Sequence, residues 1–180
     1  MKQRPILFST PMVQAILECR KTQTRRKADM LSRHLRKLED GTFEGESGRI
    51  YKCPYGKVGD ILWVRETFMN ALNFPVLSDN FYYKASVSNQ FLQEWKGCWK
   101  PSIFMPKDAC RIWLEIVSVK VERLQDISEG NAIKEGSEYL LNVREWFADL
   151  WKSINGDESW RNNPWVWVIE FKQIENPNIK

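Results

Sequence analysis

The sequence predicts an α+β fold built on a small β-barrel with flanking helices. Several short apolar strands are separated by long connections, and three or four segments have helical spacing. Strand–helix–strand alternation does not recur, which argues against a doubly wound parallel sheet. The 180 residues, 43% hydrophobic and 28% charged, suit a single domain over residues 1–180 with a sizeable core and an insertion at about residues 28–50.

The N-terminal part predicts a strand, a helix and a second strand. Residues 6–8 are a short apolar run that ends at Ser9, Thr10 and Pro11, where a hydroxyl can cap a helix and proline suits its first turn. Apolar residues at positions 12, 13, 16 and 17 then predict one amphipathic helix that ends near Arg20. The side chains of residues 22–26 alternate and favour a strand, in which Thr22, Thr24 and Arg26 lie on the same face.

The middle of the chain predicts an inserted helix and loop, followed by two strands. Methionine and leucine residues at positions 30, 31, 35 and 38 have helical spacing between basic residues. Residues 41–48 are small, polar and glycine-rich. We therefore expect a helix over 30–38 and a mobile loop over 41–48. Residues 56–60 predict a turn, and residues 61–66 and 81–85 predict strands.

The C-terminal part predicts an interrupted strand, two helices and a closing strand. Apolar residues that can face the core alternate at positions 112, 114 and 116 and then at positions 117, 119 and 121. Because the alternation changes phase between Ile116 and Val117, a β-bulge or sharp bend is expected there. Asp126 and Ser128 cap a short helix that runs through about Glu135. Apolar residues at 143, 146, 147, 150, 151 and 154 predict an amphipathic helix, and residues 165–174 predict the closing strand.

Basic residues are concentrated at the N-terminal end. Residues 1–37 contain ten basic and two acidic side chains, a net charge of +8, whereas the rest of the chain has a net charge of −4. A basic segment on a nearly neutral body is typical of proteins that bind a polyanion, nucleic acid first. The alternative is an ordinary solvated charged face.

The residue types argue against a metal, a cofactor or a membrane span. Cys19, Cys53, Cys98 and Cys110 are far apart with no Cys-x-x-Cys pair, so reduced thiols are favoured, and the lone His34, expected on the surface, cannot complete a zinc site. Acid–base chemistry would therefore fall to Lys, Glu, Asp or a hydroxyl. No apolar run approaches the roughly 20 residues of a membrane span, and the N-terminus does not resemble a signal peptide, so a cytoplasmic protein is expected.

Four stretches of the sequence resemble the ASCH domain family of the PUA-like superfamily, in particular its longer phage and prophage members. They are residues 4–9, the Arg-Lys-Thr-Gln-Thr-Arg-Arg stretch at 20–26, residues 59–67 and residues 126–136. The likeness runs from about Arg4 to Phe171. Cys19 stands where the family usually has glycine, and a positive φ at that position would cost a cysteine about 1 kcal/mol. Gly130 and Asn131 replace an acidic pair that is common among the longer members.

The resemblance implies a PUA-like β-barrel whose groove meets RNA or a modified nucleoside. Some small members of the family are amidohydrolases that deacetylate N4-acetylcytidine, and others have been described as ribonucleases. Matched motif by motif, the catalytic Lys, Thr and Glu of the amidohydrolases fall on Lys21, Thr24 and Glu135. Arg20, Arg25 and Arg26, which surround this motif in the sequence, are the expected cationic neighbours of Lys21 and the candidates to bind substrate or nucleic acid.

The chemistry of these residues is consistent with acyl transfer. A threonine hydroxyl needs a base to take its proton, and Lys21 serves only as the neutral amine, which burial and cationic neighbours favour. Glu135 can then position the amine leaving group or protonate it, and Arg26 can polarise the carbonyl oxygen. The alternative is structural: Thr24 as a strand threonine, Lys21 as a solvated cation at a helix end, and Glu135 at the surface.

A second candidate binding cluster lies at the end of the strand predicted over residues 61–66. Trp63, Arg65 and Glu66 follow one another there, and an Arg–Glu pair in a groove can bind a base edge or act in phosphodiester chemistry. A structural salt bridge is the alternative. The nine tryptophans fit core packing for the most part, although Trp95 and Trp99 flank lysines in a pattern that also suits base stacking.

Overall fold

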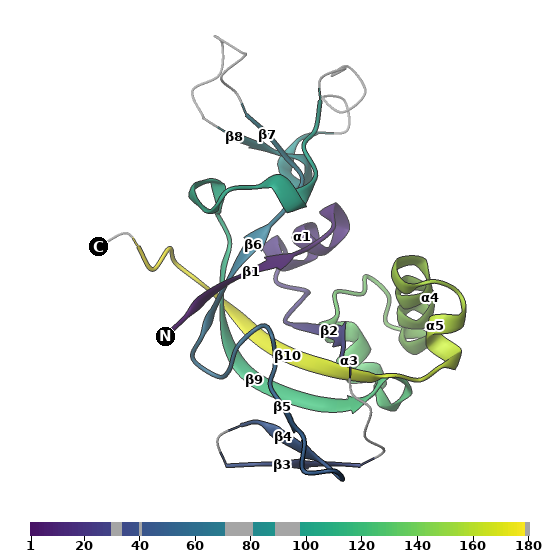
Figure 1. The fold of residues 1–180 in the computed structure, drawn as a ribbon. Coiled ribbons are helices and arrows are strands. Elements are labelled where there is room, and N and C mark those ends of the chain that lie inside the picture. Colours follow the sequence, from purple (N-terminus) through teal and green to yellow (C-terminus); the bar gives the residue numbers. More distant parts are fainter. Residues whose placement is uncertain (30–33, 40, 71–80, 89–97, 179–180) are drawn as a thin grey trace.

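The computed structural model describes residues 1–29, 34–39, 41–70, 81–88 and 98–178. Its strands are β1 (Gln3–Leu7), β2 (Gln23–Lys27), β3 (Leu35–Lys37), β4 (Phe43–Gly45), β5 (Ile50–Tyr51), β6 (Ile61–Arg65), β7 (Phe68–Asn70), β8 (Phe81–Tyr83), β9 (Trp113–Arg123) and β10 (Trp165–Ile174). Its α-helices are α1 (Thr10–Leu17), α3 (Glu129–Lys134), α4 (Val143–Asn155) and α5 (Glu158–Arg161), and short 3-10 turns cover Lys84–Ser86, Ser102–Phe104, Lys107–Ala109 and Leu124–Asp126. The predicted α+β class is confirmed (Figure 1).

One curved five-stranded sheet forms the body of the molecule, in the order β1-β6-β9-β10-β2 (Figure 1). β1 pairs with β6 in parallel, and the other pairs are antiparallel. Within the described residues no backbone ladder joins β2 back to β1, so a closed barrel stays a prediction. The two edge strands are linked instead by a side chain, because Arg26 donates a 2.6 Å hydrogen bond to the Leu7 carbonyl.

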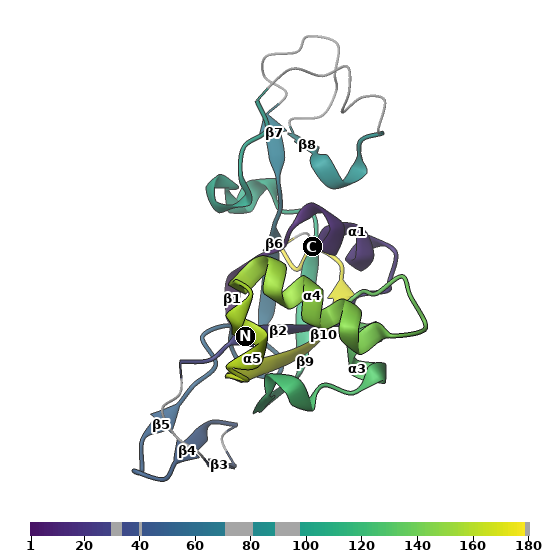
Figure 2. The same cartoon turned by 90° about the vertical axis from the view of Figure 1, so that its right-hand side faces the viewer.

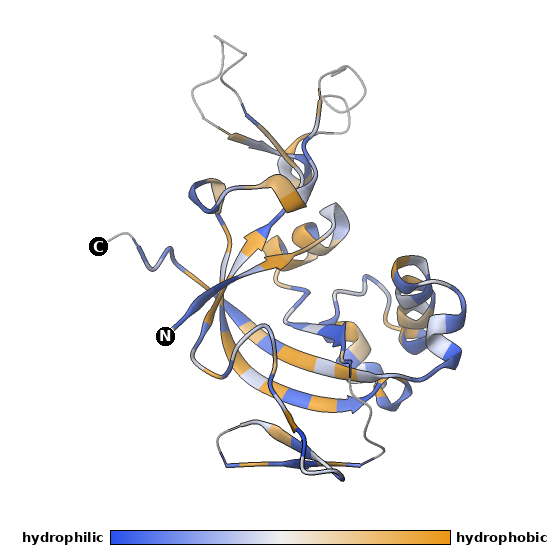
Figure 3. Ribbon diagram, viewed as in Figure 1, coloured by the Kyte–Doolittle hydropathy of each residue, from blue (hydrophilic) through white to orange (hydrophobic). Residues whose placement is uncertain are grey.

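The predicted bulge is present in β9. Glu170 of β10 pairs with Ser118 and the next residue, Phe171, pairs with Ile116, so Val117 has no partner. The side chains of Ile116 and Val119 are both buried, whereas that of Val117 is 42% exposed. The extra residue therefore keeps the apolar face of the strand on the core across the bend, and the expectation that Val117 itself faces inward was wrong. The alternation along β9 and β10 is visible in Figure 3.

Helix α4 packs against the sheet through the face predicted from its periodicity. Val143, Phe147 and Trp151 are buried against Val166 and Val168 of β10. Figure 2 shows α4 crossing in front of the sheet, with α3 beside it. None of the helices in the described part of the chain has the length and apolar content needed to span a bilayer.

The predicted inserted helix was wrong. Leu35–Lys37 is the strand β3, which pairs with β4 (Phe43–Gly45), and β4 pairs with β5. Residues 30–33 lie outside the described residues. The glycine-rich stretch expected to be a mobile loop contains Phe43, whose ring lies 5.5 Å from that of Trp167 in an edge-on arrangement. This long-range contact anchors the small three-stranded sheet to the core.

Cys19 ends helix α1 in a left-handed conformation, with φ of 59°. The turn is tight, since the backbone amides of Arg20 and Lys21 both donate to the carbonyl of Ala15, at 2.8 and 2.9 Å. A side chain with a Cβ atom is strained in this conformation. The turn sends the chain back across the end of α1 and so places Lys21.

We expect Cys19→Gly to stabilise the protein by about 0.5–1 kcal/mol, because glycine adopts positive φ without the Cβ clash. Thermal or urea unfolding measures this. Cys19→Ala is the matched control, since it removes the thiol but keeps the Cβ atom and should leave stability nearly unchanged. A gain of equal size in the alanine variant would show that the thiol, not the backbone, is the source of strain.

Candidate active site

The backbone brings Lys21 and Glu135 together from distant parts of the chain. Lys21 forms an isolated antiparallel bridge with Glu135, and the Thr22 amide donates a 2.9 Å hydrogen bond to the Lys134 carbonyl. The end of helix α3 therefore adds to the start of β2 like a short extra strand. Ser128 caps α3 as predicted, because its hydroxyl oxygen accepts a hydrogen bond from the Asn131 amide.

The Lys21 and Glu135 side chains form a buried ion pair. The Lys21 ammonium donates to Glu135 Oε2 and to the Glu135 carbonyl oxygen, each at 2.8 Å. The Lys21 side chain has no exposed surface, and that of Glu135 is 3% exposed. The solvated helix-end position considered as the alternative for Lys21 is therefore not what the structure shows.

Arg25 joins this pair from the neighbouring strand. Its Nη1 atom donates to Glu135 Oε1 at 2.9 Å and to Gln23 Oε1 at 2.7 Å. Its Nε and Nη2 atoms donate to Glu122 Oε1 on β9 at 3.1 and 2.6 Å. Glu135 thus holds two buried cations with its two oxygens, and we call Lys21, Arg25, Glu122 and Glu135 the ionic cluster.

Burial lowers the pKa of Lys21 below its usual value of 10.5. The carboxylate of Glu135 opposes this effect, while the cationic neighbours Arg26 and Arg25 add to it. The net direction is downward, which favours the neutral amine compared with a lysine in water. The environment of Lys21 is thus of the kind in which a lysine can act as a base.

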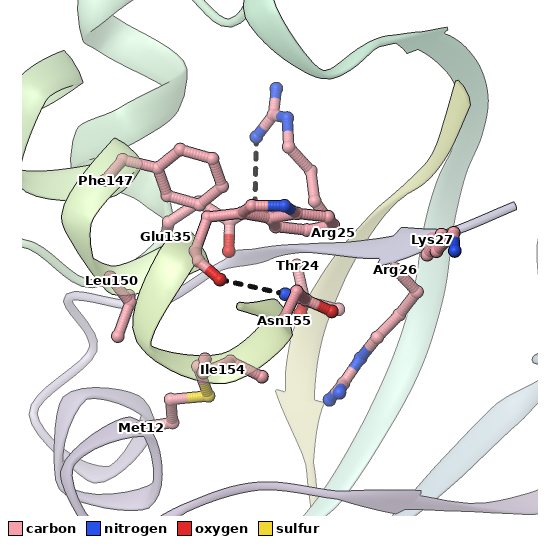
Figure 4. Close-up of a pocket in the computed structure, with 11 residues that line it drawn as sticks. Met12, Thr24, Arg25, Arg26, Lys27, Glu135, Phe147, Leu150, Ile154 and Asn155 are labelled. Atoms are coloured by element: carbon pink, nitrogen blue, oxygen red, sulfur yellow. Dashed lines mark hydrogen bonds and ion pairs between the residues drawn. The ribbon is translucent and has the colours of Figure 1, made fainter. Parts of the chain in front are cut away.

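A small cavity of about 60 Å³ lies directly beside the ionic cluster (Figure 4). Thr24, Arg25, Arg26 and Lys27 of β2 line it, together with Glu135; the other lining residues are Met12, Phe147, Leu150, Trp151, Ile154 and Asn155. Thr24 is only 2% exposed. Within the described residues its hydroxyl forms no hydrogen bond with Lys21, whose ammonium is held by Glu135.

A second cavity of about 260 Å³ continues on the other side of Glu135. It shares Met12, Glu135 and Leu150 with the first cavity, so the two cavities adjoin, and we call them together the groove. Arg20, Tyr139 and Trp146 also line this part. The groove therefore offers an apolar floor, an aromatic wall and the carboxylate of Glu135 at its centre.

Arg20 and Arg26 flank the groove but are already engaged by protein groups. Arg20 forms ion pairs with Glu18 and Glu138 and donates to the Gly136 carbonyl at 2.6 Å. The Arg26 guanidinium lies over the Phe8 ring at 5.1 Å, and its Nε atom is buried without a hydrogen-bond partner among the described residues. Of the two, Arg26 has the donor left over for a ligand.

Trp63, Arg65 and Glu66 do not line either part of the groove. The Arg65 guanidinium lies over the Trp63 ring and donates to the Ile103 carbonyl. Glu66 is 1% exposed and pairs with Arg111, not with Arg65, at 2.8 and 2.9 Å. This bidentate pair has the geometry of a structural salt bridge, the alternative considered for Glu66.

The basic N-terminal segment does not form one continuous solvated face. Lys21 and Arg25 are buried in the ionic cluster, and Arg36 pairs with Glu44 across β3 and β4. His34 is exposed, as expected, with 86% of its side chain accessible. Much of the charge excess counted over residues 1–37 is therefore neutralised locally, and Arg33 lies outside the described residues.

The residues that sequence reasoning missed are the apolar walls of the groove. Leu150 and Trp151 were interpreted as packing positions of an amphipathic helix, and Met12 as part of the core. One signal was present in the sequence, because the apolar pattern of α4 extends to Ile154, beyond the residues that pack on the sheet. In the structure Ile154 is 56% exposed and lines the first cavity. The indole Nε1 atom of Trp151 is also buried without a hydrogen-bond partner in the described part of the chain.

No family model and no curated protein match this sequence significantly. The solved structures that are similar to it include the following two. One is an ASCH domain from Lactobacillus crispatus, with 16% identity over 97% of this chain and 81% of that chain, and a TM-score of 0.46. The other is a DUF984 family protein from Enterococcus faecalis, with 13% identity over 100% of this chain and 84% of that chain, and a TM-score of 0.46.

Proposed function

We propose that this chain is an ASCH-type protein that binds an N4-acylated cytosine nucleoside, free or within RNA, in the groove and hydrolyses its amide bond. The observation that carries the proposal is the fully buried contact between Lys21 and Glu135, 2.8 Å long, beside a cavity lined by Thr24. A lysine buried among cations, a carboxylate and a hydroxyl supply the three groups that amide hydrolysis needs.

Thr24 is the proposed nucleophile. Its hydroxyl oxygen bonds to the acyl carbon of the substrate and passes its proton to the neutral Lys21 amine. The C–N bond then breaks, and the departing N4 nitrogen takes the proton from Lys21. Water hydrolyses the acyl-threonine by the reverse proton path, which releases the carboxylic acid and regenerates the hydroxyl. Glu135 orients the Lys21 amine throughout, and Arg26 polarises the carbonyl oxygen.

The volumes of the two cavities fit the two parts of the proposed substrate. The cavity of about 60 Å³ beside Thr24 matches a small acyl group and not a whole nucleoside. The adjoining cavity of about 260 Å³, with Tyr139 and Trp146 in its wall, matches the base. Binding without turnover is the second candidate, favoured by the ion pair that holds the Lys21 ammonium on Glu135. Ribonuclease activity has no further support from the groove.

Purified protein incubated with N4-acetylcytidine should release cytidine, and Thr24→Ala should lower the rate at least about 100-fold. Thr22→Ala is the matched control, because Thr22 lies two positions before Thr24, is exposed and lines neither cavity, so that this variant should keep the wild-type rate. The rate should rise with pH as the Lys21 amine loses its proton and level off below 10.5, the usual lysine pKa.

Lys21→Met tests the base directly and should lower the rate by a similar factor, provided that a thermal melt shows the variant to be folded. If it does not fold, the pH profile of the wild type remains the measure of the Lys21 role. A wild type that turns over no acylated cytidine, or a Thr24→Ala variant as fast as wild type, leaves nucleoside or RNA binding as the working function.

A further inference from the structure

A separate cavity of about 470 Å³ lies where the start of β1 meets the turn over residues 56–60. Its lining residues are Met1, Lys2, Arg4, Gly41, Thr42, Lys52, Cys53, Gly56, Lys57 and Asp60. In Figure 1 the N-terminal end of β1 and helix α4 stand on opposite sides of the molecule. This cavity is therefore distinct from the groove around Glu135.

The walls of this cavity are strongly basic. Lys2, Arg4, Lys52 and Lys57 contribute four cationic side chains against one carboxylate, that of Asp60. None of the four has an ion-pair partner among the residues that the structure describes. Like charges around one cavity repel one another, and an anion bound between them would relieve this repulsion. We call Lys2, Arg4, Lys52 and Lys57 the basic pocket.

Asp60 offsets only part of the charge of the basic pocket, and its carboxylate oxygens are held by the backbone. Its Oδ1 accepts a 2.7 Å hydrogen bond from the Lys2 amide, and its Oδ2 accepts one of 3.2 Å from the Lys57 amide. Burial alone would raise the pKa of Asp60, but these two amides, together with the positive charges of the N-terminal amine and Arg4, lower the pKa below its usual value. Gly56 makes room for this arrangement, since a Cβ there would lie 2.8 Å from Asp60 Oδ2.

Arg4 lacks the partner that an arginine needs. Its Nε atom is buried and forms no hydrogen bond within the described part of the chain. A guanidinium cannot lose its proton at physiological pH, so a buried donor of this kind is costly unless an acceptor reaches it. The fork of an arginine fits the oxygens of a phosphate group in a bidentate manner. The Arg4 guanidinium thus lines the cavity with hydrogen-bonding capacity that no described protein group uses.

We propose that the basic pocket binds phosphate groups, supplied by a free nucleotide or by successive phosphates of an RNA strand. Four cations around one cavity suit a multiply charged anion better than a single carboxylate. The volume of about 470 Å³ lies within the range of small-molecule sites. The proposal is independent of the proposed hydrolysis, since none of these residues lies in the groove.

The test compares Arg4→Gln/Lys57→Gln with Arg161→Gln/Lys172→Gln, a double variant that removes the same charge outside this cavity. Affinity for a short single-stranded oligoribonucleotide and for inorganic triphosphate is measured as a function of salt. In the first variant, affinity should fall at least about tenfold and the salt slope should decrease by about one unit per lost contact. The control should stay within about twofold of wild type.

The two probes distinguish the sources of phosphate. If triphosphate binding depends on Arg4 and Lys57, the ligand is a free nucleotide; if only oligoribonucleotide binding depends on them, it is the RNA backbone. Equal affinities in the two double variants, or no binding of either probe by wild type, would overturn the proposal. Hydrolysis of free N4-acetylcytidine, which carries no phosphate, should be unchanged by Arg4→Gln/Lys57→Gln, so the two proposals fail separately.

Discussion

Replacing Glu135 with alanine should lower the free energy of unfolding by about 3–5 kcal/mol at neutral pH. The substitution removes the carboxylate that binds both Lys21 and Arg25, whose side chains have no exposed surface. Lys21 keeps only the Glu135 carbonyl as an acceptor. Removal of one partner of a buried ion pair is costly because the charge that remains is neither solvated nor paired. Urea unfolding measures the loss.

The Glu135→Ala loss should shrink as the pH is raised toward 10.5. Glu135 is the group that raises the pKa of Lys21 against burial, so the variant has an even lower folded-state pKa for this lysine. The unfolded chain then binds the proton more tightly, and stability increases with pH between the folded and unfolded values. Glu138→Ala is the control: Glu138 is 74% exposed in its pair with Arg20, and its loss should cost less than about 0.5 kcal/mol at any pH. A similar loss in both variants would contradict the argument.

Gly136→Ala should destabilise the protein by about 3 kcal/mol, through backbone strain and overpacking together. Gly136 has φ of 104°, and an added Cβ would lie 2.9 Å from Ala15 Cβ and 3.1 Å from Lys21 Cβ. The end of α3, the end of α1 and the ionic cluster meet at this point, so neither neighbour can move freely. The added Cβ should also displace Lys21, so the variant should hydrolyse N4-acetylcytidine more slowly than wild type even under conditions in which it is fully folded.

Gly156→Ala separates the two contributions to this effect. Gly156 has a similar φ of 91°, but an added Cβ there meets nothing within 4 Å. Its substitution should cost about 1–3 kcal/mol, the backbone strain alone. If the two alanine variants are equally destabilised, the close packing of α3 on Lys21 is not what requires glycine at position 136.

Local pattern was sufficient for the long elements of this fold. The apolar spacing over residues 143–154 predicts helix α4 almost to its bounds, and residues 165–174 predict β10. The phase change at Val117 predicts the bulge, because the alternation of inward and outward side chains is visible within the strand's own sequence. The prediction for the insertion was wrong because its structure depends on pairing with another segment. β3 has three residues, and what makes it a strand is its pairing with Phe43–Gly45, which no periodicity within 30–38 records.

The site was accessible from the sequence only in part. The juxtaposition of Lys21 with Glu135 came from resemblance, since nothing in the local pattern connects residues 114 positions apart. Glu122, which completes the ionic cluster, was not predicted. Arg25 was expected at a binding surface, yet it is buried against Glu122 of β9 because β2 pairs with β10 in a register that the sequence does not state. Ion-pair choice depends on tertiary contacts of this kind.

At the bulge in β9, the presence of an extra residue at position 117 matters more than the identity of its side chain. β9 has eleven residues and its partner β10 has ten, and the difference is accommodated at Val117. Its side chain is exposed, so most substitutions there leave the core untouched. Deletion is another matter: it would turn the bulge into a regular ladder, with Ile116 and Val119 still facing inward and Ser118 outward, and the strand would lose the bend and extra twist that the bulge supplies. Sequence length at this position is thus under tighter physical constraint than sequence identity.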